Sequence, residues 1–174
     1  MTCILQNLVV FQLLLGVSAT ENLQQKTVLK FNQSIVNANA QLKKAGFAYG
    51  KSISPLFSGK PVNVKLVAQS YVNAITTLEN VERQMKNLNV PQSKKARAFY
   101  QSHQKFLQGQ RKMILNDFAE ILSIAVNPNY NLRTRKTKIV PILDRVTKKE
   151  KGPLSELSKA QVEFVNFYNI KLEY

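Results

Sequence analysis

Two clusters of basic residues are the strongest candidates for a functional site in this chain of 174 residues. One lies near position 95, and the other contains eight basic and two acidic residues between positions 133 and 151. Lysine and arginine neutralise phosphate, sulfate or carboxylate groups without reading a sequence, so binding through them weakens as salt rises. The alternative is that each cluster is a solvated face. We predict an anion-binding surface made of ten side chains: Lys94, Lys95, Arg97, Arg133, Arg135, Lys136, Lys138, Arg145, Lys148 and Lys149.

Residues that could catalyse a reaction or hold a metal are few. His103 is the only histidine and Cys3 the only cysteine, so no histidine and cysteine ligand set exists. Two acidic pairs have the i, i+3 spacing of one helical face: Glu79 with Glu82, and Asp117 with Glu120. The Glu-x-x-His motif of di-iron bundles is absent. We therefore expect no catalytic residue, metal site or cofactor, and a buried, hydrogen-bonded His103. A weaker alternative is an enzyme that uses Asp117, Glu120 and His103 in a cleft.

Two short motifs resemble functional sequences but lack the context that these need. The segment AGFAYGKS (45–52) resembles a phosphate-binding loop, yet its glycine spacing is one residue short and an amphipathic helix precedes it. We interpret it as a helix end, with Gly50 as the left-handed cap. Asn32-Gln33-Ser34 matches the N-x-[ST] sequon, which matters only in a eukaryotic secretory pathway and falls inside a predicted helix.

The net charge favours the same class of partner as the clusters do. Twenty-five lysines and arginines against 10 acids leave a charge of +15, and no acid occurs from Asn22 to Leu78. Such a charge exceeds what solubility alone requires, and indicates an acidic cell-wall or matrix polymer, anionic lipid or nucleic acid as partner. No zinc-finger spacing, aromatic RNA-binding motif or helix-turn-helix pattern accompanies it.

The N-terminal segment predicts export. The run LVVFQLLLGV, Leu8 to Val17, has the length of a signal-peptide core and is too short for a spanning helix of about 20 residues. Val17 and Ala19 are the small residues expected before a cut between Ala19 and Thr20. The flank before the run lacks lysine and arginine, which leaves an uncleaved N-terminal helix or an anchor as alternatives.

The rest of the chain has the apolar periodicity of helices. One seam runs from Val28 to Tyr49 and another from Val64 to Leu88, with spacings of three and four residues. A third, longest helix is predicted from about Pro91 to Val126, with Gly109 at a kink or a close helix crossing. The basic segment NYNLRTRKTK (129–138) then reads as an exposed connector. A short helix over 141–149 and a last helix from Pro153 complete the chain.

These patterns predict an all-α protein, an up-down bundle of four main helices with a short connecting helix. We predict that residues 1–19 are a signal peptide that is cleaved off, and that residues 20–174 form one helical-bundle domain. The expected protein is secreted or periplasmic, is not an enzyme, and binds an anionic polymer or lipid surface through its basic face. If the N-terminus is retained, the same charge favours an intracellular nucleic-acid-binding protein.

Overall fold

The seams of the sequence form four long helical rods. The computed structural model describes residues 23–170 of the chain, and no strand occurs among them. The predicted leader over 1–19 lies outside these residues. The elements are α1 (Leu23–Ile53), a 3-10 helix η1 (Ser54–Ser58), α2 (Val64–Lys86), α3 (Lys94–Lys112), a π-helical turn η2 (Met113–Phe118), α4 (Ala119–Val126) and α5 (Leu132–Phe167). The all-α prediction is confirmed.

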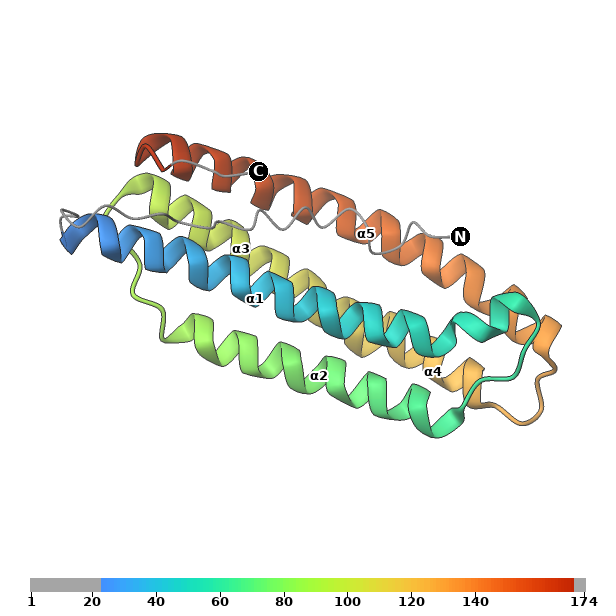
Figure 1. Ribbon diagram of the computed structural model, residues 1–174. Coiled ribbons are helices and arrows are strands. Elements are labelled where there is room, and N and C mark those ends of the chain that lie inside the picture. Colours follow the sequence, from blue (N-terminus) through green and yellow to red (C-terminus); the bar gives the residue numbers. More distant parts are fainter. Residues whose placement is uncertain (1–22, 171–174) are drawn as a thin grey trace.

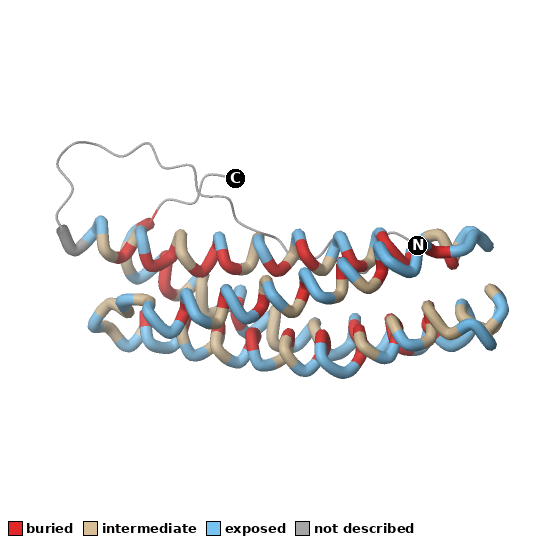
Figure 2. Tube along the Cα trace, turned by 90° about the horizontal axis from the view of Figure 1, so that it is seen from below, coloured by how far each residue is buried: buried red, intermediate tan, exposed pale blue. Residues whose placement is uncertain are grey.

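Successive rods alternate in direction along one bundle axis (Figure 1). The rods are α1, α2, the continuous run of α3, η2 and α4, and α5. The strongest packing joins α1 to α2 and α3 to α5. Buried and exposed stretches alternate along each helix in Figure 2, as expected when every rod turns one apolar seam inward. The prediction of four main helices is confirmed, and each rod presents the rest of its circumference to solvent.

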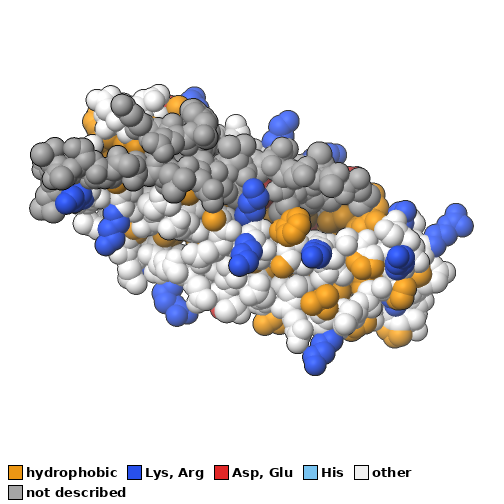
Figure 3. All heavy atoms as spheres, viewed as in Figure 1, with side chains coloured by type: hydrophobic (Ala, Val, Ile, Leu, Met, Phe, Trp, Pro, Cys, Tyr) orange, Lys and Arg blue, Asp and Glu red, His pale blue; other side chains and the backbone are white. Residues whose placement is uncertain are grey.

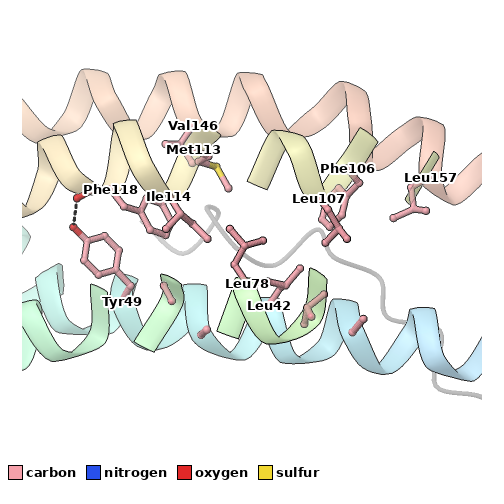
Figure 4. Close-up of a cluster of buried hydrophobic side chains, with 14 of the residues drawn as sticks. Leu42, Tyr49, Leu78, Phe106, Leu107, Met113, Ile114, Phe118, Val146 and Leu157 are labelled. Atoms are coloured by element: carbon pink, nitrogen blue, oxygen red, sulfur yellow. Dashed lines mark hydrogen bonds between the residues drawn. The ribbon is translucent and has the colours of Figure 1, made fainter. Parts of the chain in front are cut away.

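Aromatic side chains tie the rods together at both halves of the bundle. In one half, the ring of Phe31 lies 5.8 Å from that of Phe99 and 5.3 Å from that of Phe164, measured between centroids. In the other half, Tyr49 stacks on Phe118 at 4.6 Å and its hydroxyl donates a 2.7 Å hydrogen bond to the Phe118 carbonyl (Figure 4). Contacts of this kind fix the relative heights of helices that are distant in sequence.

The last rod is longer than the sequence pattern indicated. The prediction of an exposed connector over 129–138, a short helix over 141–149 and a new helix from Pro153 is wrong, because α5 is one helix that begins at Leu132. Asn131 caps it: the Asn131 side chain accepts a 2.9 Å hydrogen bond from the Thr134 backbone N–H.

Two internal prolines are tolerated because of where they lie on α5. A helical proline leaves the carbonyl four residues earlier without its donor. For Pro141 and Pro153 these carbonyls belong to Thr137 and Lys149, which are exposed residues, so water can satisfy them. Ile139 and Ile142 are buried on either side of Pro141, and the half-buried Pro153 lies between the buried Val146 and Leu157, so packing on both sides of each proline outweighs the local preference for a break.

The helices also begin and end at residues other than the prolines and glycines that the sequence suggested. Asn63 and Ser93 cap α2 and α3, so Pro91 precedes the third helix instead of opening it. The prediction that Gly50 caps the first helix is wrong, because α1 continues to Ile53. The left-handed cap is Gly59, at φ 69° after η1. A helix can run through Gly50 because the following turn is held by the buried Ile53.

The π turn explains an irregular point in the third seam. A π turn contains one residue more than an α turn, so Met113 and Ile114 are both buried, as are Asp117 and Phe118. Gly109, one turn earlier, faces α5: a Cβ placed on it would lie 3.9 Å from the Pro153 ring. This is an ordinary van der Waals distance, so the contact between the third rod and α5 at Gly109 does not depend on the absence of a side chain.

Candidate anion-binding surface

The ten predicted anion-binding residues do not form one surface. Lys95, at the start of α3, contacts Glu163 near the end of α5, with a 2.9 Å distance between its Nζ and a carboxylate oxygen. Lys136, near the start of α5, donates a 3.4 Å hydrogen bond to the Phe57 carbonyl in η1. The two clusters lie at opposite ends of the bundle, about 40 Å apart along α5 at 1.5 Å per residue.

The cluster at the start of α3 has acidic neighbours. The Lys95 ammonium lowers the pKa of Glu163 by a hydrogen bond and by charge. Lys94 and Arg97 are exposed and make no ion pair within residues 23–170. An ion pair at this end offsets part of the positive charge, so the field of the cluster is weaker than its three cations suggest.

Arg145 and Lys149 both donate hydrogen bonds to a buried carboxylate. Asp117 is almost fully buried, with 2 % of its side chain exposed. It accepts hydrogen bonds from Arg145 Nε at 2.7 Å and from Lys149 Nζ at 2.9 and 3.0 Å. Arg145 also pairs with Glu120, and these carboxylates raise the pKa of its guanidinium. Both cations already have partners within the bundle, so we do not count them among the cations available to a binding partner.

The end of the bundle that contains η1 and the start of α5 carries basic residues and no acidic residue. We call the part formed by residues 50–70 and 121–143 the basic end; it contains the end of α1, η1, the start of α2, the end of α4 and the start of α5. No aspartate or glutamate occurs in either range. The basic residues of this end are Lys51, Lys60, Lys65, Arg133, Arg135, Lys136 and Lys138.

Four of these seven side chains are available to a partner. Arg135 donates a 2.7 Å hydrogen bond to the Asn127 carbonyl, and Lys138 lies over the Tyr130 ring at 5.2 Å from its centroid. Lys136 has the contact with Phe57 described above. The other four are exposed and form no hydrogen bond or ion pair through their side chains within the described part of the chain: Lys51, Lys60, Lys65 and Arg133.

Sequence reasoning missed Lys51, Lys60 and Lys65. Each is isolated in the sequence, and only the tertiary structure brings them to the end where Arg133 begins α5. The acid-free run from Asn22 to Leu78 was the available signal, because a lysine in such a run has no local carboxylate to neutralise it.

Hydrophobic side chains lie close to this basic end. Figure 3 shows them gathered among lysines and arginines over α1 and α2, on the half of the face nearer η1. The exposed large hydrophobic residues of these two helices are Phe47, Val64, Leu66 and Val72. A surface that is both apolar and basic differs from an ordinary solvated face, whose exposed apolar residues are scattered singly.

The structure separates His103 from Asp117 and Glu120, the two acids of the enzyme hypothesis. His103 is fully buried, and its Nε2 lies 3.0 Å from the Asn39 side-chain oxygen. Asp117 lies about 20 Å further along the same rod, at 1.5 Å per residue, beside Arg145 and Lys149. The hydrogen bond expected for a buried histidine is present, and the one unpaired ring atom is Nδ1.

We predict that His103 makes the fold acid-sensitive. Burial lowers its pKa from 6.5 to about 4. Between these pH values the unfolded chain binds a proton at His103 and the folded chain does not. The contribution of His103 to the free energy of unfolding is therefore complete above pH 6.5 and is lost as pH falls to about 4. The expected loss is about 3 kcal/mol. Burial raises the pKa of Glu150, so its protonation acts in the opposite direction at the acidic end of this window.

Urea denaturation of the wild type and of His103→Gln at pH 7 and pH 4 measures this contribution. The amide of glutamine does not titrate, so the variant should lose less stability on acidification than the wild type does. Equal losses in the two proteins would show that His103 does not carry the effect.

The two short motifs have structural positions. The segment 45–52 is helical throughout and belongs to α1. Asn32 is buried, and its side-chain oxygen accepts a 3.2 Å hydrogen bond from Gln161 Nε2 of α5. A glycan on Asn32 would have to displace α5 from this contact.

Residues 23–170 offer neither a metal-binding cluster nor a membrane-spanning helix. They contain no group of three histidine, cysteine, aspartate or glutamate side chains arranged to hold a metal ion. None of the described helices combines the length and the apolar content needed to cross a membrane. Comparison with protein-family models, with curated proteins and with solved structures found no match to this chain.

Proposed function

We propose that this protein is an exported, non-catalytic helical bundle that binds an anionic partner through its basic end. The observation that carries the proposal is the separation of charge along the bundle. Seven cations and no acid lie within the basic end, whereas the eight described acids lie outside it, with Glu120 and Asp144 directly at its border. Four of the cations have no partner among residues 23–170, so we take their charge as available for binding.

The classes of partner follow from the chemistry of lysine and arginine. They are an acidic cell-wall or matrix polymer, an anionic lipid surface and nucleic acid. Export favours the first two, and rests on the predicted cleavage between Ala19 and Thr20. A mature chain that begins at Met1 would favour the alternative, an intracellular nucleic-acid-binding protein.

We predict that neutralising the basic end abolishes most polyanion binding. The variant carries six glutamine substitutions, at Lys51, Lys60, Lys65, Arg133, Lys136 and Lys138; Arg135 is kept because it holds the Asn127 carbonyl. Titration with heparin at two salt concentrations should show at least about 30-fold weaker binding at low salt. The slope of log K against log salt should become shallower by about one for each contact removed.

A matched control removes six exposed cations from elsewhere on the bundle: Lys26, Lys30, Lys86, Lys94, Arg97 and Lys105. It lowers the net charge equally, so a purely global effect of charge would weaken both variants to the same degree. The proposal requires heparin binding close to wild type in the control, and equal losses in the two variants would refute it.

A further inference from the structure

Apolar and basic side chains are interleaved on the surface of the α1 and α2 hairpin. Phe47 is 60 % exposed in α1, and Leu66 and Val72 are exposed in α2. Figure 3 shows hydrophobic side chains gathered on the half of this face nearer η1. We call the exposed hydrophobic residues Phe47, Val64, Leu66 and Val72 the apolar patch.

Helical spacing places lysines beside the apolar patch. Lys44 and Lys51 lie three residues before and four residues after Phe47, so all three share the outer side of α1. On α2, Lys65 and Val72 are two turns apart on one side. Residues 23–78 contain seven lysines, no arginine and no acid, so the charge around the patch has one sign.

We infer that the apolar patch and the lysines around it dock on the surface of an anionic lipid bilayer. Phenylalanine, leucine and valine side chains leave water for the boundary between headgroups and acyl chains, while lysine ammonium groups stay with the phosphates and carboxylates of the headgroups. The inference rests on the proposed function, from which it takes the basic end, and it selects one class of partner.

Two observations favour a bilayer over a soluble polyanion. A polysaccharide or nucleic-acid backbone offers charge but little hydrocarbon, so it would leave the apolar patch in water. A bilayer with anionic lipid offers both charge and hydrocarbon, with the charge at its surface and the hydrocarbon just below. Because no described helix can cross a membrane, the interaction expected of residues 23–170 is peripheral.

A single tryptophan can report directly on this contact. The chain has no tryptophan, so Phe47→Trp creates a unique probe at the most exposed residue of the patch. On addition of phosphatidylcholine vesicles with about 30 % phosphatidylserine, its emission should shift to the blue and be quenched by brominated acyl chains. Phe167→Trp is the matched control, because Phe167 is 56 % exposed at the far end of α5 and should show neither change.

Removal of the apolar patch separates this inference from the proposed function. The triple variant Phe47→Gln, Leu66→Gln and Val72→Gln keeps every lysine, so it should bind heparin as the wild type does. Its binding to anionic vesicles in a sedimentation assay should weaken at least about tenfold. The control triple variant changes exposed apolar residues outside the patch and should bind vesicles normally: Leu115→Gln, Val162→Gln and Phe167→Gln.

The outcomes distinguish the bilayer inference from the proposed function. Wild-type protein that binds heparin but not anionic vesicles, or a patch variant that binds vesicles normally, refutes the bilayer and leaves the proposed function intact. Wild-type protein that binds neither refutes both. A blue shift of Phe47→Trp that grows with protein concentration in the absence of vesicles would show that a second copy covers the patch, and would also refute the bilayer.

Discussion

Replacing Arg145 and Lys149 together by methionine is expected to lower the free energy of unfolding by about 3–5 kcal/mol. The reason lies in Asp117, whose buried carboxylate receives hydrogen bonds from both cations. Methionine retains much of the aliphatic stem of each side chain, so the variant loses charge more than packing. It leaves the Asp117 carboxylate buried in the bundle without its two cationic partners, which costs far more than the loss of an exposed ion pair.

Two further variants isolate this effect. Adding Asp117→Asn to the double variant removes the stranded charge, so most of the lost stability should return. Lys148→Met alone changes an exposed lysine of the same helix that has no ion pair in residues 23–170, and should cost less than about 0.5 kcal/mol. Urea denaturation followed by circular dichroism measures all three. A double variant within about 1 kcal/mol of wild type would show that Asp117 does not depend on these cations.

Phe164→Ala is expected to cost about 3–5 kcal/mol of unfolding free energy. The Phe164 ring is fully buried and lies 5.3 Å from the rings of Phe31 and of Phe99, so it connects α5 with α1 and α3. Its removal loses the transfer free energy of the ring and leaves a cavity where three rods meet, since neighbouring aromatic rings can only partly fill it.

Phe167→Ala is the matched control, since it makes the same change three residues later on the same helix. Phe167 is largely exposed and contacts the ring of Tyr168, so its removal should cost less than about 1 kcal/mol. Thermal or urea unfolding distinguishes the two. Similar losses for both variants would mean that the aromatic cluster does not hold the three rods together.

The helical class of this protein followed from local physics. Apolar residues at spacings of three and four give each segment one seam, and a segment with one seam is stable only when the seam is buried against another. The seams from Val28 to Tyr49 and from Val64 to Leu88 therefore predicted two packed helices, which correspond to α1 and α2.

The helix boundaries were predicted less well, because a proline or glycine states only a local preference. Pro141, Gly152 and Pro153 suggested two breaks, yet α5 passes through all three. The cost of an internal proline is a few kcal/mol at most when its freed carbonyl faces water, and the buried side of a long helix outweighs it. A proline or glycine in the sequence does not show whether tertiary packing holds the helix together through it.

The sequence by itself determined the charge, the acid-free run and the helical rods, since each of these is a property of composition or of neighbours in the chain. Only the tertiary structure decided which cations act together. Antiparallel packing brings the start of α5 beside η1, and so joins Arg133 to Lys51, Lys60 and Lys65, while it separates them from Lys94 and Arg97. It also commits Arg145 and Lys149 to Asp117. Charges act through distance in space, and helix packing sets those distances among residues that the sequence keeps far apart.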